Sequence, residues 1–276
     1  MKIFVINPGS TSTKLALYED DVCVRKRTVY HPKQDLARFQ HVNEQFAYRD
    51  KVIRDTLVEH DLPLEFDAVI ARGGLLRPIP GGVYEITEAI KHDLKYSKME
   101  HVSNLGAWIA DDLAREAGCP AFIADPEVVD ELMPEARVTG LPQISRVSVF
   151  HALNSKAVSR HYAASVGKKY EDMNLIVVHL GGGISVSAHR HGRVIDVNNA
   201  LNGDGPFSPE RAGTLPADQL VELCFSGEYT KRQVKNMLNG HGGLAAHLGM
   251  TDMKEITQHA MAGEEPYKHV VEAMMY

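Results

Sequence analysis

The chain has 276 residues, with 30 Lys and Arg against 36 Asp and Glu, and a formal net charge of −6. This length suits one large domain or two ordinary ones. The acidic balance disfavours a nucleic-acid-binding surface, and the longest apolar runs are too short to span a bilayer. The run Lys2–Ile6 is typical of a strand and not of a signal peptide. Three widely spaced cysteines without a C-x-x-C motif indicate a reducing compartment, so we expect a cytoplasmic protein.

An internal repeat is the strongest sign of domain organisation. Residues 3–24 and 175–196 align without a gap, and each segment is an apolar run, a small-residue turn, an alternating strand, a polar turn and a further apolar strand. The continuous apolar runs predict strands buried on both faces. His191-Gly192 predicts a hairpin turn, and Glu19–Asp21 marks the matching turn in the first copy. Chance similarity between two glycine-containing hairpins is the alternative.

The repeat predicts an α/β chain of two domains with related architecture, residues 1–148 and 149–276, each opening with a three-stranded meander. Thr87 is a predicted cap of a short helix that starts at Glu88. Ser103 is a predicted N-cap of a helix that ends at Gly118. The other predicted elements are strands over 66–71 and 120–124, helices over 43–60, 151–165, 217–225, 231–238 and 252–262, and a long Gly/Pro loop over 203–216.

The last predicted helix begins at Pro266 and carries Val270, Val271 and Met274 on one apolar face. No cap or closing strand follows it, and the second copy of the repeat is much shorter than the first. We therefore expect the second domain to be incomplete. The alternative is a protein that ends in an apolar helix docked on its core.

Two turns have the composition of phosphate-binding loops. The first, Asn7 to Lys14, follows a buried strand and offers a glycine, four hydroxyl groups and a lysine, which suit phosphate oxygens. The second, His179 to Ser185, contains three successive glycines and allows close approach of the backbone to a ligand. Neither a Walker A loop nor a G-x-G-x-x-G motif occurs. Two related turns in two related domains point to a nucleotide-phosphate site more strongly than either turn does.

The first turn, Val5-Ile-Asn-Pro-Gly-Ser-Thr-Ser-Thr-Lys14, resembles the phosphate-1 loop of the acetate and butyrate kinase family. The long loop over 196–216 is similar to the butyrate branch of that family, as are Ala71–Gly74, His101–Gly106 and Leu223–Gly227. The resemblance implies two actin-like (ribonuclease H-like) domains with a cleft between them. It also implies transfer of a phosphoryl group from ATP to a carboxylate, butyrate in this branch, giving an acyl phosphate and ADP with the help of Mg²⁺. The implied partners are this small carboxylate and further copies of the chain in a homo-oligomer, with no nucleic acid and no membrane.

The resemblance also implies roles for single residues. Arg211 matches the arginine that stabilises the transition state, His151 a hydrogen-bond donor to the transferring phosphoryl group, and Asp125 the acidic residue that places Mg²⁺. His101 matches a further active-site histidine, which we expect to bind substrate. Phosphate and nucleotide binding is implied for both turns, at Asn7, Ser10, Ser12, Lys14, His179, Gly181, Gly182 and Gly183. These residue types suit phosphoryl transfer to a carboxylate. The carboxylate is already ionised at neutral pH, so the reaction needs charge neutralisation, alignment and a metal but no general base.

The chain departs from the acetate branch at three places. Arg72 stands where that branch has a histidine before Gly-Gly, and Val69 stands at its upstream substrate arginine, so Arg72 is our candidate for binding the substrate carboxylate. Gly182 stands where the acetate branch has asparagine. The family's Gly-Gly adenosine loop and C-terminal acidic residue do not occur in the sequence, which supports the expectation of an incomplete second domain.

Several alternatives remain open at this point. Asp125, which precedes a proline, could be a turn residue, and Arg72 and Arg77 could pair with acids at the surface. His189 and His191 are more typical of hydrogen-bonded or surface residues than of metal ligands. For function, the alternatives are a kinase of acetate, propionate or a branched acid, a non-catalytic ATP-binding module, and an inactive ATP-binding fragment of this fold.

Overall fold

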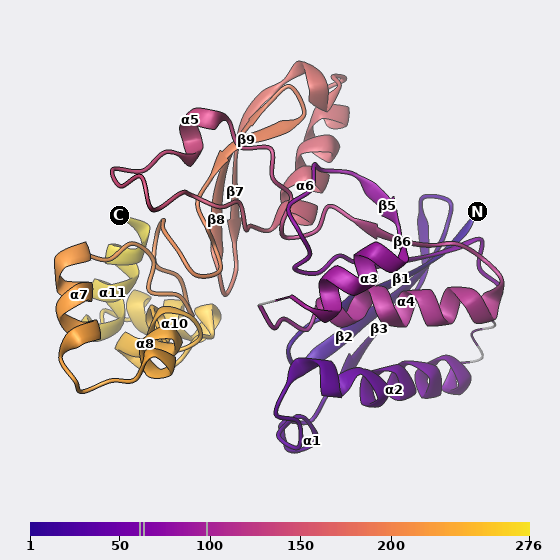
Figure 1. Ribbon diagram of the computed structural model, residues 1–276, viewed down its shortest axis with the longest axis horizontal. Coiled ribbons are helices and arrows are strands. Elements are labelled where there is room, and N and C mark those ends of the chain that lie inside the picture. The colour runs from indigo at the N-terminus through magenta and orange to yellow at the C-terminus, as the bar shows by residue number, and fades with distance from the viewer. Residues whose placement is uncertain (61, 63, 98) are drawn as a thin grey trace. The chain divides into compact units, whose positions relative to one another are not determined.

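The computed structural model describes residues 1–276 except 61, 63 and 98. The chain forms two compact units, unit 1 over Met1–Val129 and unit 2 over Asp130–Tyr276 (Figure 1). The segment after residue 130 packs within unit 2, where the Met133 N–H donates to the Ile195 carbonyl at 3.0 Å. The domain boundary after residue 148 stays a prediction, because a packing unit and a repeated domain need not end at the same residue.

Unit 1 is built on a six-stranded sheet with the order β3-β2-β1-β4-β6-β5. The first three strands form an antiparallel meander, and β4 and β6 continue the sheet parallel to β1. This confirms the meander predicted from the first copy of the repeat. The strands are β1 (Lys2–Pro8), β2 (Ser12–Glu19), β3 (Val22–Tyr30), β4 (Ala68–Arg72), β5 (Val83–Glu85) and β6 (Ala121–Ala124).

The two long helices of unit 1, α2 (Phe46–Glu59) and α4 (Asn104–Ala117), lie side by side against the sheet (Figure 1). Their apolar faces and the inner faces of β1, β4 and β6 form the core, in which Ile53, Ile109 and Ile123 are fully buried. The shorter helices are α1 (Lys33–Leu36), the 3₁₀ turn η1 (Val42–Gln45) and α3 (Glu88–Lys95).

The predicted helix boundaries are confirmed at all three positions. The Thr87 hydroxyl accepts from the Ile90 N–H at the start of α3, and Gly118 ends α4 in the left-handed conformation. Ser103 is the N-cap residue of α4, as predicted, but it has helical dihedrals and its side chain makes no cap hydrogen bond. Its hydroxyl lies 2.6 Å from His101 Nδ1 instead.

Unit 2 begins with α5 (Pro134–Arg137), α6 (Ala152–Ser165) and the 3₁₀ turn η2 (Tyr170–Asp172). A three-stranded antiparallel sheet follows, formed by β7 (Asn174–Leu180), β8 (Ile184–Arg190) and β9 (Arg193–Val197). This is the meander predicted from the second copy of the repeat. His191 and Gly192 connect β8 to β9 with φ of 50° and 78°, as a tight hairpin turn with two left-handed residues requires.

Only one face of β7 is covered, so the prediction of burial on both faces is wrong for this strand. Ile176, Val178 and Leu180 are 71%, 52% and 75% exposed. The opposite face packs on α6. Periodicity could not reveal this, because apolar residues on both faces of β7 predict burial whether or not a second layer is present.

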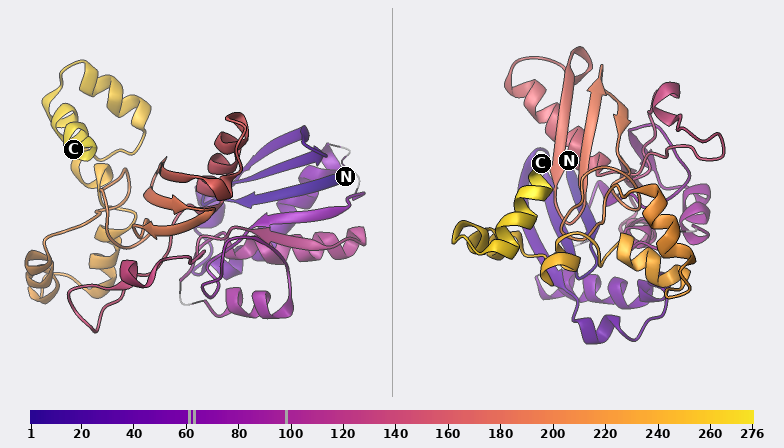
Figure 2. Two further views of the ribbon diagram at one scale, coloured as in Figure 1. Left: turned by 90° about the horizontal axis from the view of Figure 1, so that it is seen from above. Right: turned by 90° about the vertical axis from the view of Figure 1, so that its left-hand side faces the viewer.

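After β9, unit 2 continues with a long loop over 198–216 and then with helices. Its helices are α7 (Ala217–Phe225), α8 (Lys231–Leu238), α9 (Leu244–Leu248), α10 (Met253–Met261) and α11 (Glu265–Met275). Figure 2 shows α10 and α11 (yellow) as a helical hairpin. Leu244, Ile256 and Val271 form the buried core of this part, so the predicted apolar face of the last helix is confirmed. Within the part of the chain that the structure describes, no helix is long and apolar enough to cross a membrane.

Candidate active site

The first phosphate-like turn connects β1 to β2 at the end of a tightly packed hairpin. Asn7 pairs in register with Lys14, so their side chains share one face of the sheet with Ser12, two residues before Lys14. Lys14 and Ser10 are exposed, and Asn7 and Ser12 are half-buried. The structure therefore gathers the four predicted residues of this turn around one exposed hairpin end.

The other side of this turn is held by a residue that the sequence reasoning missed. Arg49 of α2 is 1% exposed and donates to the carbonyl oxygens of Gly9 at 3.0 Å and Ser10 at 2.9 Å. Thr13 lies on this buried side and its hydroxyl is 2.8 Å from His31 Nε2. Burial, and then the positive charge of Arg49, lower the pKa of His31 to about 4, so this ring is neutral at pH 7. The sequence did contain one sign of this burial. Arg49 lies one helical turn before Ile53, which places it on the apolar face of the predicted helix.

Arg72 and Asp125 meet at the carboxyl ends of neighbouring parallel strands. Arg72 is the last residue of β4 and pairs in register with Ala124 of β6, so Asp125 follows directly beside it. Asp125 is 4% exposed, has a φ of 34°, and accepts from the Gly82 N–H at 2.8 Å. It is thus an ordered, buried carboxylate at a strand end and not an exposed turn residue.

A second missed residue, Glu127, joins the two predicted substrate residues. Its Oε1 lies 2.7 Å from Arg72 Nη2 and 3.9 Å from His101 Nδ1. Only 11% of the Glu127 side chain is exposed, so its charge is compensated mainly by this arginine. In the sequence, Glu127 stands out only because it lies two residues after Asp125 and directly before the apolar pair Val128-Val129. Arg77, for which an acidic partner was one of the open alternatives, pairs with Asp93, with Nη2 2.7 Å from Oδ1.

In unit 2, His151 and His179 lie face to face. Their rings stack with centroids 3.8 Å apart and an interplanar angle of 7°. His151 is the N-cap residue of α6, and His179 is near the end of β7, where it pairs in register with Ser185. The strand pairing and the start of α6 therefore bring together two histidines that are far apart in the sequence.

Hydrogen bonds orient both rings. The His151 N–H donates to Ser185 Oγ at 3.3 Å, and this oxygen lies 2.8 Å from His151 Nδ1. With Oγ donating its proton to Nδ1, the proton of a neutral His151 ring is on Nε2. The Asn154 amide lies 2.9 Å from His179 Nδ1 and fixes that ring in the same way. Each imidazole can thus present an N–H donor at Nε2.

The glycine turn after β7 allows close packing around these rings. A Cβ at Gly183 would lie 3.0 Å from the Ala200 carbonyl oxygen and 3.3 Å from His151 Cε1. The Gly182 carbonyl accepts from Ser208 Oγ at 2.6 Å and from the Glu210 N–H at 3.2 Å. A Cβ at Gly182 would lie 2.9 Å from Glu210 Oε2, so this glycine leaves room for the acid beside Arg211.

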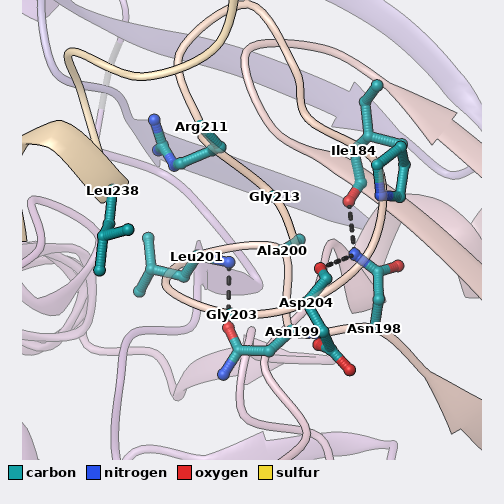
Figure 3. Close-up of a pocket in the computed structure, with 11 residues that line it drawn as sticks. Ile184, Asn198, Asn199, Ala200, Leu201, Gly203, Asp204, Arg211, Gly213 and Leu238 are labelled. Atoms are coloured by element: carbon teal, nitrogen blue, oxygen red, sulfur yellow. Dashed lines mark hydrogen bonds between the residues drawn. The ribbon is translucent and has the colours of Figure 1, made fainter. Parts of the chain in front are cut away.

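Arg211 lies in the long loop after β9, and its side chain points away from Asn198 in Figure 3. Only 21% of its side chain is exposed, and Nη1 contacts the Glu210 carbonyl at 3.2 Å and Oε2 at 3.4 Å. Among the described residues its buried Nε has no hydrogen-bond partner. The adjoining pocket, lined by Ala200, Leu201 and Leu238 among others, has a volume of about 10 Å³ and can hold at most one water molecule. The guanidinium is therefore partly desolvated and held by its loop, and its Nε donor is unpaired among the described residues.

Asp125 is the carboxylate for which Mg²⁺ binding is predicted. Mg²⁺ is commonly bound by one or two carboxylates together with phosphate oxygens and water, so a single buried Asp at a strand end is sufficient. No cluster of three or more His, Cys, Asp or Glu residues suited to a metal occurs in the described part of the chain. A metal bound entirely by side chains is therefore not supported there, whereas a metal shared with nucleotide phosphates is compatible with Asp125.

Comparison with known proteins defines the class of this fold and site. The model of the Acetokinase family matches residues 143–276. A protein of Phocaeicola vulgatus named "Probable butyrate kinase" is 68% identical over 276 residues, which is 100% of this chain and 78% of that protein. A protein of Bacteroides thetaiotaomicron with the same name is 49% identical over 277 residues, again with 100% and 78% covered. Porphyromonas gingivalis acetate kinase superposes with a TM-score of 0.77 at 17% identity, over 99% of this chain and 76% of that one.

The superposition shows that the chain has the fold of this acetate kinase, which confirms the predicted α/β fold class. The chain belongs to the acetokinase family. Unit 1 holds the first turn together with Arg72, His101 and Asp125, and unit 2 holds His151, the second turn and Arg211. The catalytic and binding roles of these residues stay predictions.

Proposed function

We propose that this protein transfers the γ-phosphoryl group of ATP to the carboxylate of butyrate, forming butanoyl phosphate and ADP in a reversible reaction. The observation that supports the substrate most directly is the 68% identity, over all 276 residues, to a protein named "Probable butyrate kinase". A carboxylate oxygen attacks the γ-phosphorus and the bond to the β-phosphate oxygen breaks, so no proton has to move.

The residues of unit 1 suit the binding of two anions. Asn7, Ser12 and Lys14 share one face of the β1–β2 hairpin and would bind nucleotide phosphates. Arg72 would bind the substrate carboxylate. Glu127 contacts its guanidinium at Nη2, and a guanidinium has five N–H donors, so Arg72 can pair with a second carboxylate. His101, which is 3.9 Å from the same Glu127 oxygen, would complete this polar pocket.

Asp125 of unit 1 would hold Mg²⁺. The metal, when bound, neutralises charge on the phosphate oxygens. The Gly82 N–H fixes Asp125 Oδ1 at 2.8 Å, so this carboxylate is oriented before any metal arrives.

The residues of unit 2 suit the charge that develops during transfer. The Arg211 guanidinium is partly desolvated, which strengthens its interaction with a phosphoryl group. His151 and His179 would donate from Nε2, and the glycines at 181–183 would allow phosphate oxygens to approach the backbone. The predicted cytoplasmic location and homo-oligomeric state stay predictions.

The test is acyl-phosphate trapping with hydroxylamine. The protein is incubated with ATP and Mg²⁺ and with acetate, propionate, butyrate or isobutyrate in turn. We expect hydroxamate with every substrate to depend on ATP, and kcat/KM to be highest for butyrate. A higher kcat/KM for another acid would replace butyrate by that acid, and ATP hydrolysis without any hydroxamate would favour an ATP-binding module over a carboxylate kinase.

A further inference from the structure

Arg49 is a buried cation directly beneath the first phosphate-like turn. The residue is 1% exposed and lies on α2. Its Nε donates to Gln45 Oε1 at 3.0 Å, and its two terminal nitrogens donate to the Gly9 and Ser10 carbonyl oxygens at 3.0 and 2.9 Å. All of these acceptors are neutral groups.

This cation has no acidic partner among the residues that the structure describes. The next residue, Asp50, pairs with Arg54 at 2.8 Å. Burial lowers the pKa of Arg49 to about 10, so the side chain keeps its charge at neutral pH. The neighbouring His31 adds no second charge, because its pKa is lowered to about 4. Since a buried charge without a counterion is costly, a compensating anion is expected nearby when the protein is at work.

The contacts of Arg49 also orient the backbone of the turn. The carbonyl oxygens of Gly9 and Ser10 point to Arg49, the Thr11 carbonyl accepts from the His31 N–H at 2.8 Å, and the Ser12 carbonyl accepts from the Gly9 N–H at 2.7 Å. Among the described residues, the structure shows no acceptor for the N–H groups of Ser10 and Thr11. With the carbonyl oxygens turned inward, these N–H groups are available to an anion on the exposed side.

We infer that Arg49 is a positioning residue for nucleotide phosphates: it holds the Gly9 and Ser10 carbonyl oxygens inward and supplies the buried positive charge that a polyphosphate anion compensates. The inference rests on the proposed function, because it takes this turn as the phosphate site. Arg49 acts through the turn and through its field, without touching the ligand.

The test is a comparison of ligands that differ in phosphate charge. ATP, ADP and adenosine are titrated calorimetrically into wild type, Arg49→Met and Arg49→Lys. Arg54→Met is the matched control, because Arg54 is on the same helix and pairs with Asp50 and Glu116. We expect Arg49→Met to weaken ATP binding by about tenfold or more, ADP by less, and adenosine by under about twofold, with Arg49→Lys in between and the control near wild type.

Equal weakening of ATP and adenosine, or no weakening of ATP in a folded Arg49→Met, would overturn the inference while leaving the proposed function intact. Wild type that binds no nucleotide would overturn both. If Arg49→Met does not fold, Arg49→Lys and hydrogen exchange in wild type decide. ATP should slow amide exchange at Ser10 and Thr11, and unchanged exchange there in a protein that binds ATP would overturn the inference.

Discussion

The buried ion pair between Lys156 and Glu131 should dominate the local stability of unit 2. The Lys156 ammonium lies 3.0 and 2.9 Å from the two Glu131 carboxylate oxygens and also donates to the Gly192 carbonyl at 3.1 Å. Glu131 Oε2 accepts from the Val194 N–H at 2.7 Å. The pair thus ties the start of unit 2 to α6, which carries His151 at its N-terminus, and to the β8–β9 hairpin.

The expected magnitude follows from burial. The two side chains are only 2% and 6% exposed. Unit charges about 3 Å apart attract by about 5 kcal/mol at an effective dielectric constant of about 20, and much of this is offset by the loss of hydration. Removing the second partner costs less than removing the first, because the first removal already leaves a buried charge without its partner. We expect Lys156→Met and Glu131→Gln each to lower the free energy of unfolding of unit 2 by about 3 kcal/mol, and the double variant by about 2 kcal/mol less than their sum.

The assay needs a probe for each unit. The single tryptophan, Trp108, lies in α4 of unit 1, so its fluorescence during urea denaturation reports on unit 1. Hydrogen exchange of peptides from 152–165 and 184–197 reports on unit 2. Lys51→Met is a control, since this exposed lysine pairs with Asp55 and should change stability by under about 0.5 kcal/mol. Strict additivity of the two variants, or a loss below about 1 kcal/mol for Lys156→Met, would refute the reasoning.

Three further predictions concern pH and catalysis. Burial first, and then Lys156, lower the pKa of His189 to about 4 from the ordinary 6.5, so unfolded unit 2 binds more protons in this range and the stability of unit 2 should fall by about 2 kcal/mol between pH 7 and 5. His189→Gln should flatten this slope, and equal urea midpoints for wild type at both pH values would contradict it. Arg211→Ala should lower kcat by about two to three decades with little change in ATP affinity, and near-normal turnover would exclude its role. Asp125→Ala should lose a similar amount of activity, partly restored by high Mg²⁺, and a loss independent of Mg²⁺ would count against metal binding there.

Features with strong local signals were predictable from sequence. The repeat gave both meanders because each strand pairs with its neighbour through a short turn, as at His191-Gly192. Thr87 and Gly118 were predictable because a helix cap interacts only with residues within one turn of the helix end. Ser103 has the same local signal but no capping bond, because His101, two residues earlier, lies within hydrogen-bond distance of its hydroxyl.

The unpredicted features depend on contacts between distant segments. Arg49 and Glu127 look like ordinary charged residues until α2 is placed under the first turn and β4 beside β6. The stacking of His151 on His179 likewise depends on α6 packing against β7. For β7 the apolar pattern predicted burial that the structure does not show, because an apolar pattern carries no information about what covers a face.

Phosphorus NMR of the protein with ATP, butyrate and Mg²⁺ tests the proposed reaction most directly. We expect an acyl-phosphate resonance to grow together with that of ADP, at equal rates and only when butyrate is present. ADP accompanied by inorganic phosphate alone, or no butyrate-dependent loss of the ATP γ-phosphate signal, would contradict phosphoryl transfer to a carboxylate.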